Sequence, residues 1–124
     1  MDESASVTVL AVDDQAVFRR AMASLIEATP GFEQVGEAAS GSEALALAAE
    51  LRPDLVLLDV RMPGMDGFET ARRVAEVDAR IAVVLTSLDA VPPPGAAPAA
   101  VFVRKQDLSV HKLHELWAAV STRG

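Results

Sequence analysis

Side chains suited to phosphate chemistry stand at the ends of short apolar segments in this 124-residue chain. In chain order they are Asp13, Asp14, Asp59, Thr86 and Lys105. Two or three carboxylates held close together repel one another, and a hard divalent cation such as Mg²⁺ relieves that repulsion. A carboxylate can also attack phosphorus, while an ammonium group and a hydroxyl can contact phosphoryl oxygens. These residue types together indicate magnesium-assisted phosphate chemistry, with Asp59 as the reacting group.

Apolar runs typical of buried strands alternate with helical patterns along the chain. Strands are expected over residues 7–12, 32–39, 55–59, 81–87 and 100–103. Strand–helix alternation implies right-handed crossovers and a parallel sheet that helices cover on both faces. We therefore expect an α/β fold with a flavodoxin-like, doubly wound, five-stranded sheet of order 2-1-3-4-5.

In a sheet of this order, the strands that end in reactive residues are neighbours, so their carboxyl ends open onto one crevice. The edge strand ends in Ala38-Ala39 and contributes no such residue. One site at the carboxyl edge is the arrangement that this distribution predicts.

Local signals predict where the helices and turns lie. Ser40 and Glu43 form a capping box for a helix through Leu51. Asp66 and Glu69 start a third helix. Two helices are expected to turn an apolar stripe toward the core, one through Phe18, Met22, Leu25 and Ile26, the other through Leu113, Leu116, Trp117 and Val120. Gly64 and Gly67 are expected to allow positive φ in the loop after Asp59.

A proline-rich segment, residues 91–98, stands where the fourth helix of such a fold would be. Proline lacks the amide donor, and it pushes the preceding residue out of helical geometry. We therefore expect this helix to be very short or missing. A stiff surface loop and a polyproline ligand for a partner domain are both compatible with the segment.

Composition excludes several classes of function. Eleven Lys and Arg residues against 18 Asp and Glu give a net charge of −7, which argues against direct binding of nucleic acid or an anionic membrane. Cysteine is absent, so thiolate metal sites and disulfides are excluded. We find no signal-peptide pattern and no apolar run long enough for a membrane span, and expect a cytoplasmic location. The length suits one domain, residues 7–121, between a disordered acidic tail at 1–6 and a short tail at 122–124.

Across residues 7–121 the chain resembles the receiver domain of response regulators in two-component signalling. The resemblance rests on five passages: Val12-Asp13-Asp14, 53–59, Met62-Pro63-Gly64-Met65-Asp66-Gly67, Leu85-Thr86-Ser87 and Lys105. Phe18-Arg19-Arg20 and Gly36-Glu37-Ala38 look most like receivers that precede a LuxR-type helix-turn-helix output domain.

The resemblance implies phosphoryl transfer from a phosphohistidine of a sensor histidine kinase to Asp59. Mg²⁺ would be held by Asp13, Asp14, Asp59 and the backbone carbonyl of Arg61. Thr86 and Lys105 would contact the phosphoryl group, and Phe102 would be the switch aromatic. Such a domain catalyses its own phosphorylation and dephosphorylation and is not an enzyme acting on separate substrates. If the chain ends at Gly124, we expect its output to be phosphoryl shuttling or contact with a downstream protein or a detached DNA-binding output domain. Homodimer formation stays open.

Some features depart from the family pattern. Thr86 and Lys105 are 19 positions apart (105 − 86), about a helical turn less than the family usually shows. Gln106 stands where such domains commonly have proline. Both departures lie on the face that commonly carries the signal. The alternative function is therefore an interaction module that keeps the fold but acts without phosphorylation. A third, weaker hypothesis is a small hydrolase that uses Asp59 on external phosphate esters.

Each candidate residue also has a purely structural interpretation. Asp13 and Asp14 could cap the first helix. Phe102 could be an ordinary packed strand residue. His111 and His114 have a spacing compatible with a metal site, but no third convergent ligand is evident.

Overall fold

The computed structural model of the chain describes residues 6–88 and 101–121. Two predictions concern residues outside these ranges. They are the terminal tails, of which only Ser6 is described, and the short or missing fourth helix at 91–98.

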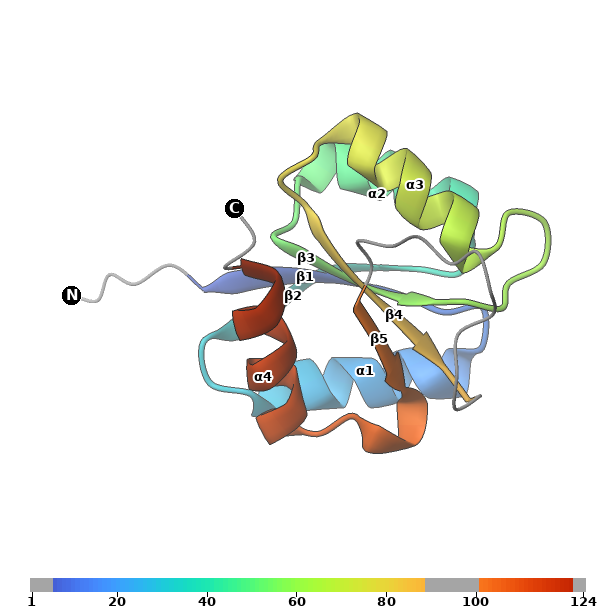
Figure 1. Cartoon of the computed structure of the whole chain (residues 1–124). Coiled ribbons are helices and arrows are strands. Elements are labelled where there is room, and N and C mark those ends of the chain that lie inside the picture. The colour runs from blue at the N-terminus through green and yellow to red at the C-terminus, as the bar shows by residue number, and fades with distance from the viewer. Residues whose placement is uncertain (1–5, 89–100, 122–124) are drawn as a thin grey trace.

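Five parallel strands form one sheet in the order β2-β1-β3-β4-β5, which confirms the predicted topology (Figure 1). The strands are β1 (Val7–Val12), β2 (Phe32–Ala38), β3 (Leu55–Asp59), β4 (Ala82–Ser87) and β5 (Val101–Arg104). Each boundary lies within one residue of the predicted one. The apolar runs in the sequence were therefore sufficient to locate every strand.

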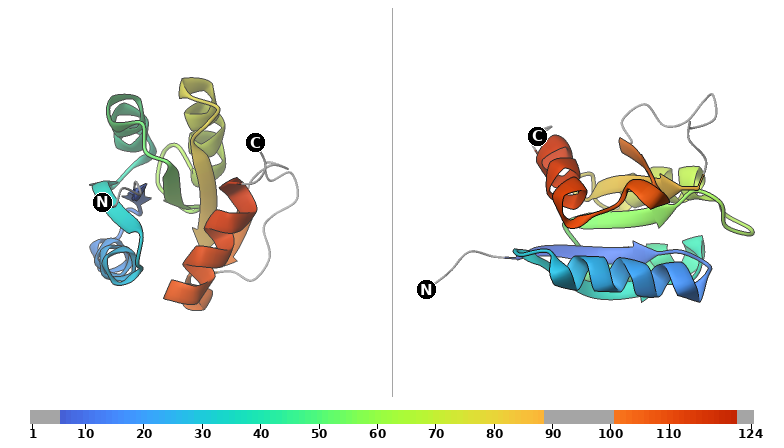
Figure 2. Two further views of the ribbon diagram at one scale, coloured as in Figure 1. Left: turned by 90° about the vertical axis from the view of Figure 1, so that its left-hand side faces the viewer. Right: turned by 90° about the horizontal axis from the view of Figure 1, so that it is seen from below.

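Helices cover both faces of the sheet, as expected for parallel strands. They are α1 (Ala16–Ala28), α2 (Gly41–Leu51), α3 (Gly67–Val77) and α4 (Val110–Ser121), with a short 3₁₀ turn, η1 (Lys105–Asp107), after β5. Helices α2 and α3 pack on one face and α1 and α4 on the other (Figures 1 and 2). None of the helices in the described part of the chain is long and apolar enough to cross a membrane.

The helix starts follow the predicted capping signals. The Ser40 hydroxyl accepts a hydrogen bond from the Glu43 amide at 3.1 Å, and the Glu43 carboxylate accepts one from the Ala39 amide at 2.8 Å. Asp66 caps α3 by accepting a hydrogen bond from the Glu69 amide at 2.9 Å. Both signals therefore act through unpaired amides at the helix start.

One of the two glycine predictions in the loop after β3 is wrong. Gly64 has a φ of +77°, as predicted, whereas Gly67 is not among the glycines with positive φ. A Cβ at Gly67 would instead collide with the backbone carbonyl of Asp59. Glycine is needed at position 67 because α3 begins against the end of β3.

Strand β3 is buried on both faces, which explains its uninterrupted apolar run. Leu55 and Leu57 belong to the core on the α1–α4 side, while Val56 and Leu58 belong to the core on the α2–α3 side. All four side chains are fully buried. The strand that carries Asp59 is thus the most tightly enclosed element, which gives its last residue a rigid support.

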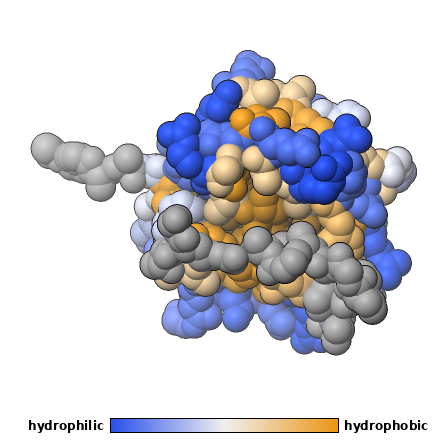
Figure 3. All heavy atoms as spheres, turned by 45° about the horizontal axis from the view of Figure 1, so that its top comes forward, coloured by the Kyte–Doolittle hydropathy of each residue, from blue (hydrophilic) through white to orange (hydrophobic). Residues whose placement is uncertain are grey.

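Figure 3 looks onto the α2–α3 side, where hydrophilic side chains gather on the helices and a hydrophobic area lies beside them. On α3, Arg72 forms exposed ion pairs with Glu69 and Glu76. Phe68, Val83 and Phe102 are half-buried apolar residues packed against the core of this side.

Candidate functional site

Three carboxylates converge at the carboxyl edge of the sheet. Each of Asp13, Asp14 and Asp59 offers an oxygen, and these oxygens lie within 4.8 Å of one another. The reason is the pairing of β1 with β3, which sets Val12 opposite Leu58 and brings the residues that follow side by side. In the described ranges, 6–88 and 101–121, this is the group of metal-ligating side chains that the structure assembles.

Lys105 joins these carboxylates from the end of β5. Its Nζ lies 2.6 Å from Asp13 Oδ2 and 3.3 Å from Asp59 Oδ1, and its side chain is only 8% exposed. The structure therefore places the ammonium group of Lys105 beside Asp59, the predicted phosphoacceptor. Its shorter contact, however, is with Asp13 and not with Asp59.

Phe18 is a pocket residue that sequence reasoning missed. Lys105 Nζ lies 3.7 Å from the centroid of the Phe18 ring, a cation–π geometry. Phe18 was predicted to face the core with Met22, yet it belongs to neither core cluster. Its position four residues after Asp14 was the available signal, since such a residue can face the same side of a helix start.

Burial and charge crowding perturb Asp59. Its side chain is nearly inaccessible, with the residue 4% exposed. Burial, followed by repulsion from Asp13, raises the pKa of Asp59 from 3.8 to about 6. The charge of Lys105 and the hydrogen bonds from Lys105 and the Arg61 amide lower the pKa, but they do not compensate fully. A carboxylate with too few donors is a candidate for chemistry or for cation binding.

Two buried oxygens in this pocket lack a partner within the described part of the chain. They are Asp14 Oδ1 and Thr86 Oγ1. Thr86 is fully buried and lies in register opposite Asp59 in the β3–β4 pair. Because buried polar atoms are normally hydrogen-bonded, both oxygens fit a site built for a further group. The residues present thus fit a hard cation and a phosphoryl group.

The capping interpretation of the two aspartates does not hold. The N-cap of α1 is Gln15, and no side chain forms a capping hydrogen bond there. Asp13 Oδ1 instead accepts a hydrogen bond from the Gln15 amide at 2.9 Å while its other oxygen contacts Lys105. Asp13 and Asp14 therefore face the pocket.

Two further predicted residues are placed without a test of their roles. The amide of Arg61 donates to Asp59, and a ligand role for the Arg61 carbonyl stays a prediction. Phe102 lies in β5 opposite Leu85 and packs against the α2–α3 side of the core. That position agrees with ordinary packing, and the switch role of Phe102 stays a prediction.

The two histidines of α4 do not form a metal site among the described residues. His111 pairs with Glu115 at 2.9 Å, and the His114 ring packs edge-on against Phe32 at 5.2 Å between centroids. These contacts explain both side chains without a metal.

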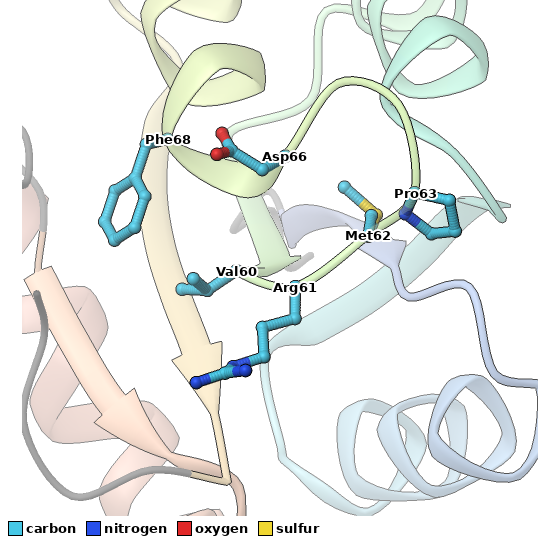
Figure 4. Close-up of a pocket in the computed structure, with 6 residues that line it drawn as sticks. All are labelled: Val60, Arg61, Met62, Pro63, Asp66 and Phe68. Carbon is cyan, nitrogen blue, oxygen red and sulfur yellow. The ribbon is translucent and has the colours of Figure 1, made fainter.

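An open cavity of about 510 Å³ lies beside the carboxylates, in the loop after β3 and at the start of α3 (Figure 4). Its lining consists of Val60, Arg61, Met62, Pro63, Asp66 and Phe68. Asp13, Asp14 and Lys105 do not line it, so this cavity is adjacent to the reactive groups and does not contain them. Beyond β4, the side-chain Nε2 of Gln106 in η1 donates to the Leu88 carbonyl at 3.5 Å.

Residues 9–97 match the sequence profile of the response regulator receiver domain. The chain belongs to this family. It is 43% identical to the transcriptional regulatory protein LiaR of Bacillus subtilis over 82 residues, which are 65% of this chain and 39% of LiaR. It is 41% identical to the nitrate/nitrite response regulator protein NarL of Escherichia coli K12 over 76 residues, 61% of this chain and 35% of NarL. The receiver therefore spans well under half the length of these relatives.

Solved receiver domains share the fold. The signal receiver domain of the response regulator NarL from Mycobacterium tuberculosis superposes with a TM-score of 0.82 at 29% identity, covering 96% of this chain and 98% of that one. The response regulator domain of Thermotoga maritima CheB gives a TM-score of 0.77 at 28% identity, covering 94% and 97%. The predicted resemblance and the predicted flavodoxin-like fold are both confirmed.

Proposed function

We propose that Asp59 of this two-component receiver accepts a phosphoryl group from the phosphohistidine of a sensor histidine kinase, in a reaction that depends on Mg²⁺. One observation carries the proposal: Asp59, Asp13 and Asp14 converge within 4.8 Å beside Lys105 and the unpartnered hydroxyl of Thr86. The general role in a phosphorelay follows from membership of the receiver family.

Asp13, Asp14, Asp59 and the Arg61 carbonyl would hold the cation. Oxygen ligands of this kind suit Mg²⁺, which keeps several positions for water and phosphate oxygens. When bound, Mg²⁺ offsets the carboxylate charges and polarises the phosphoryl group. The unpartnered Asp14 Oδ1 supports this assignment, because a buried carboxylate oxygen needs a donor or a cation.

The phosphoryl transfer itself uses side chains of this protein. A carboxylate oxygen of Asp59 attacks phosphorus, the phosphorus–nitrogen bond breaks, and the imidazole leaves with the bonding electron pair. Lys105 and the Thr86 hydroxyl then contact the phosphoryl oxygens on Asp59. With a pKa of about 6, Asp59 is mostly ionised at neutral pH, as the attack requires. Because water hydrolyses acyl phosphates, slow loss of the phosphoryl group from Asp59 is expected, and no separate substrate is turned over.

The output of residues 7–121, which we propose as the receiver domain, is a change in protein contacts. LiaR is a transcriptional regulatory protein and is much longer than the matched region. A downstream protein or a DNA-binding output domain is accordingly the partner that we propose. The charge of −7 gives the receiver itself no electrostatic affinity for nucleic acid.

The decisive experiment measures a covalent phosphate on the intact chain. Incubation with phosphoramidate and Mg²⁺ is expected to add one phosphate by intact-mass spectrometry, and a chelator should prevent it. Asp59→Asn should give no adduct. Asp54→Asn, five positions earlier at the opposite end of β3, is the matched control and should behave as the native chain. Lack of an adduct on the native chain would refute the proposal.

The phosphorylation-independent alternative stays a prediction, because the proline-rich segment that motivates it lies outside the described residues. A chain that takes up phosphate without any change in amide spectra at Thr86 and Phe102 would favour this alternative. Turnover of a generic phosphate ester would favour the hydrolase hypothesis instead.

A further inference from the structure

Two sequence passages in which the chain resembles one class of receivers contain charged residues that have no part in the chemistry proposed above. They are Phe18-Arg19-Arg20 in α1 and Gly36-Glu37-Ala38 in β2. The structure joins them through one side chain, since Arg19 Nε donates to Glu37 Oε1 at 2.8 Å. Arg19 also has a second bond: its Nη1 donates to the backbone carbonyl of Asp13 at 2.8 Å. The guanidinium therefore links the edge strand to the loop that carries two of the pocket aspartates.

Asp13 is held at every polar atom. Its amide donates to the Ala38 carbonyl at 3.1 Å, and its carbonyl accepts from Arg19. Its Oδ1 accepts from the Gln15 amide and its Oδ2 from Lys105. The bond from Arg19 is the one that reaches this residue from a side chain outside the pocket.

The link has a reason in the electrostatics of the pocket. Repulsion among three carboxylates within 4.8 Å favours any movement of the β1–α1 loop away from Asp59. A planar, forked guanidinium with two acceptors opposes that movement, because it fixes the loop backbone to a neighbouring strand. Arg19 is partly shielded, with its side chain 20% exposed, whereas the Glu37 side chain is 54% exposed.

We propose that Arg19 and Glu37 are positioning residues for the cation site, which brace the carbonyl of Asp13 so that Asp13 and Asp14 face Asp59 before a cation arrives. This inference rests on the proposed function, since the site that it serves is the proposed Mg²⁺ site. It also assigns a part to β2, the edge strand whose end was expected to contribute nothing. A preorganised site binds its cation more tightly, and loss of an outer support typically weakens metal binding by about tenfold or more.

Whether removal of Arg19 weakens or tightens Mg²⁺ binding distinguishes bracing from a purely electrostatic effect of its charge. Arg19 is a cation near an acidic pocket, so through charge alone its removal would tighten Mg²⁺ binding. Bracing predicts the opposite sign. Arg19→Lys sharpens the contrast further, because lysine keeps the charge but cannot reproduce the fork. Arg20, the exposed neighbour on the same helix, provides the matched control for charge.

The test is calorimetric titration of the whole chain with Mg²⁺, alongside amide hydrogen exchange in metal-free buffer. Arg19→Met and Arg19→Lys are each expected to weaken Mg²⁺ binding, by about tenfold for Arg19→Met. Exchange of the Gln15 amide, which bonds to Asp13, should accelerate in both variants. Arg20→Met should bind Mg²⁺ at least as tightly as the native chain and leave that exchange unchanged. Glu37→Gln should weaken binding in the native background and have no further effect in Arg19→Met.

Several outcomes would overturn the inference. They are native or tighter Mg²⁺ binding by Arg19→Met, native binding by Arg19→Lys, and unchanged exchange at Gln15. Each of these, with normal phosphate uptake at Asp59, would leave the proposed function intact. A native chain that binds no Mg²⁺ and takes up no phosphate would instead refute the proposed function, and the bracing role with it.

Discussion

The aspartates at the two ends of the sheet lie in opposite environments. At the carboxyl edge, Asp13 and Asp59 are almost completely buried and share one ammonium group, that of Lys105. At the amino edge, Asp54 and Asp78 precede β3 and β4 and are surrounded by donors.

The donors at the amino edge can be named one by one. Asp54 Oδ2 accepts from the Thr8 amide at 2.9 Å and from the Thr8 hydroxyl at 3.1 Å. Asp78 accepts from the amide and guanidinium of Arg80 and from the guanidinium of Arg52. Hydrogen bonds from Arg80, more than those from Arg52, hold the pKa of Asp78 well below its usual range.

The comparison teaches that buried carboxylates crowded together mark the reactive end. The aspartates at the amino edge connect neighbouring strands and loops, Asp54 through hydrogen bonds from Thr8 and Asp78 through Arg52 and Arg80. At the carboxyl edge, burial together with repulsion from Asp13 raises the pKa of Asp59 to about 6. Four substitutions test this difference, and they are taken in order of decreasing effect.

Lys105→Met should have the largest effect on stability. It leaves two buried carboxylates without their cation, so the free energy of unfolding in metal-free buffer should fall by about 3 kcal/mol at neutral pH. Mg²⁺ should recover part of the loss by supplying positive charge to the same oxygens. Urea unfolding with and without Mg²⁺ measures both. Lys112→Met, which removes surface interactions with Glu115 and Asp107, is the control. An equally small loss in both variants would contradict the crowding at this edge.

Asp59→Asn should change stability in the opposite direction. Because folding raises the pKa of Asp59 from 3.8 to about 6, its contribution to stability is present below pH 3.8 and is lost as the pH rises through about 6. Asparagine cannot ionise, so the metal-free variant should be more stable than the native chain by about 2 kcal/mol at neutral pH. The gain should disappear near pH 4. Urea midpoints across this range give the result, and a variant less stable at neutral pH would refute it.

The sequence located both ends of the sheet but could not distinguish their environments. Alternating apolar runs and caps such as Ser40 report on local structure, so every strand of the sheet was predictable. The strand order was expected from the doubly wound arrangement that strand–helix alternation indicates. Asp59 was identified because a carboxylate that ends a buried strand is unusual. The donors of Asp54 come from Thr8, 46 residues away, and no local pattern reports such a contact.

The same limit explains what was missed within the site. Phe18 fits the apolar stripe of α1, so periodicity assigned it to the core instead of to Lys105. Arg19 and Glu37 were noted only as parts of passages that resemble the family, because their hydrogen bond depends on β2 lying beside α1. Contacts between elements depend on how side chains meet in three dimensions, which spacing along the chain does not determine.

Asp54→Ala should show that the amino edge is structural. The change removes two hydrogen bonds to Thr8 and should lower the free energy of unfolding by about 1 kcal/mol. Phosphate uptake at Asp59 should stay at the native level in the folded variant. Asp54→Asn keeps a carbonyl acceptor and should lose less stability. Impaired phosphate uptake by a fully folded Asp54→Ala would break the separation of the two ends.

Asp78→Asn completes the comparison with the smallest expected change, since its ion pairs are near the surface. Here folding lowers the pKa, so the carboxylate stabilises the native state above pH 3.8, and this contribution is lost as the pH falls through the lower native value. The variant should therefore be less stable than the native chain at neutral pH and approach it in acid. Its difference from the native chain has the opposite sign to that of Asp59→Asn at neutral pH. Unfolding midpoints of both variants in one pH series would reveal these opposite changes. Stability changes of the same sign at neutral pH would show that the aspartates of the two edges lie in similar environments.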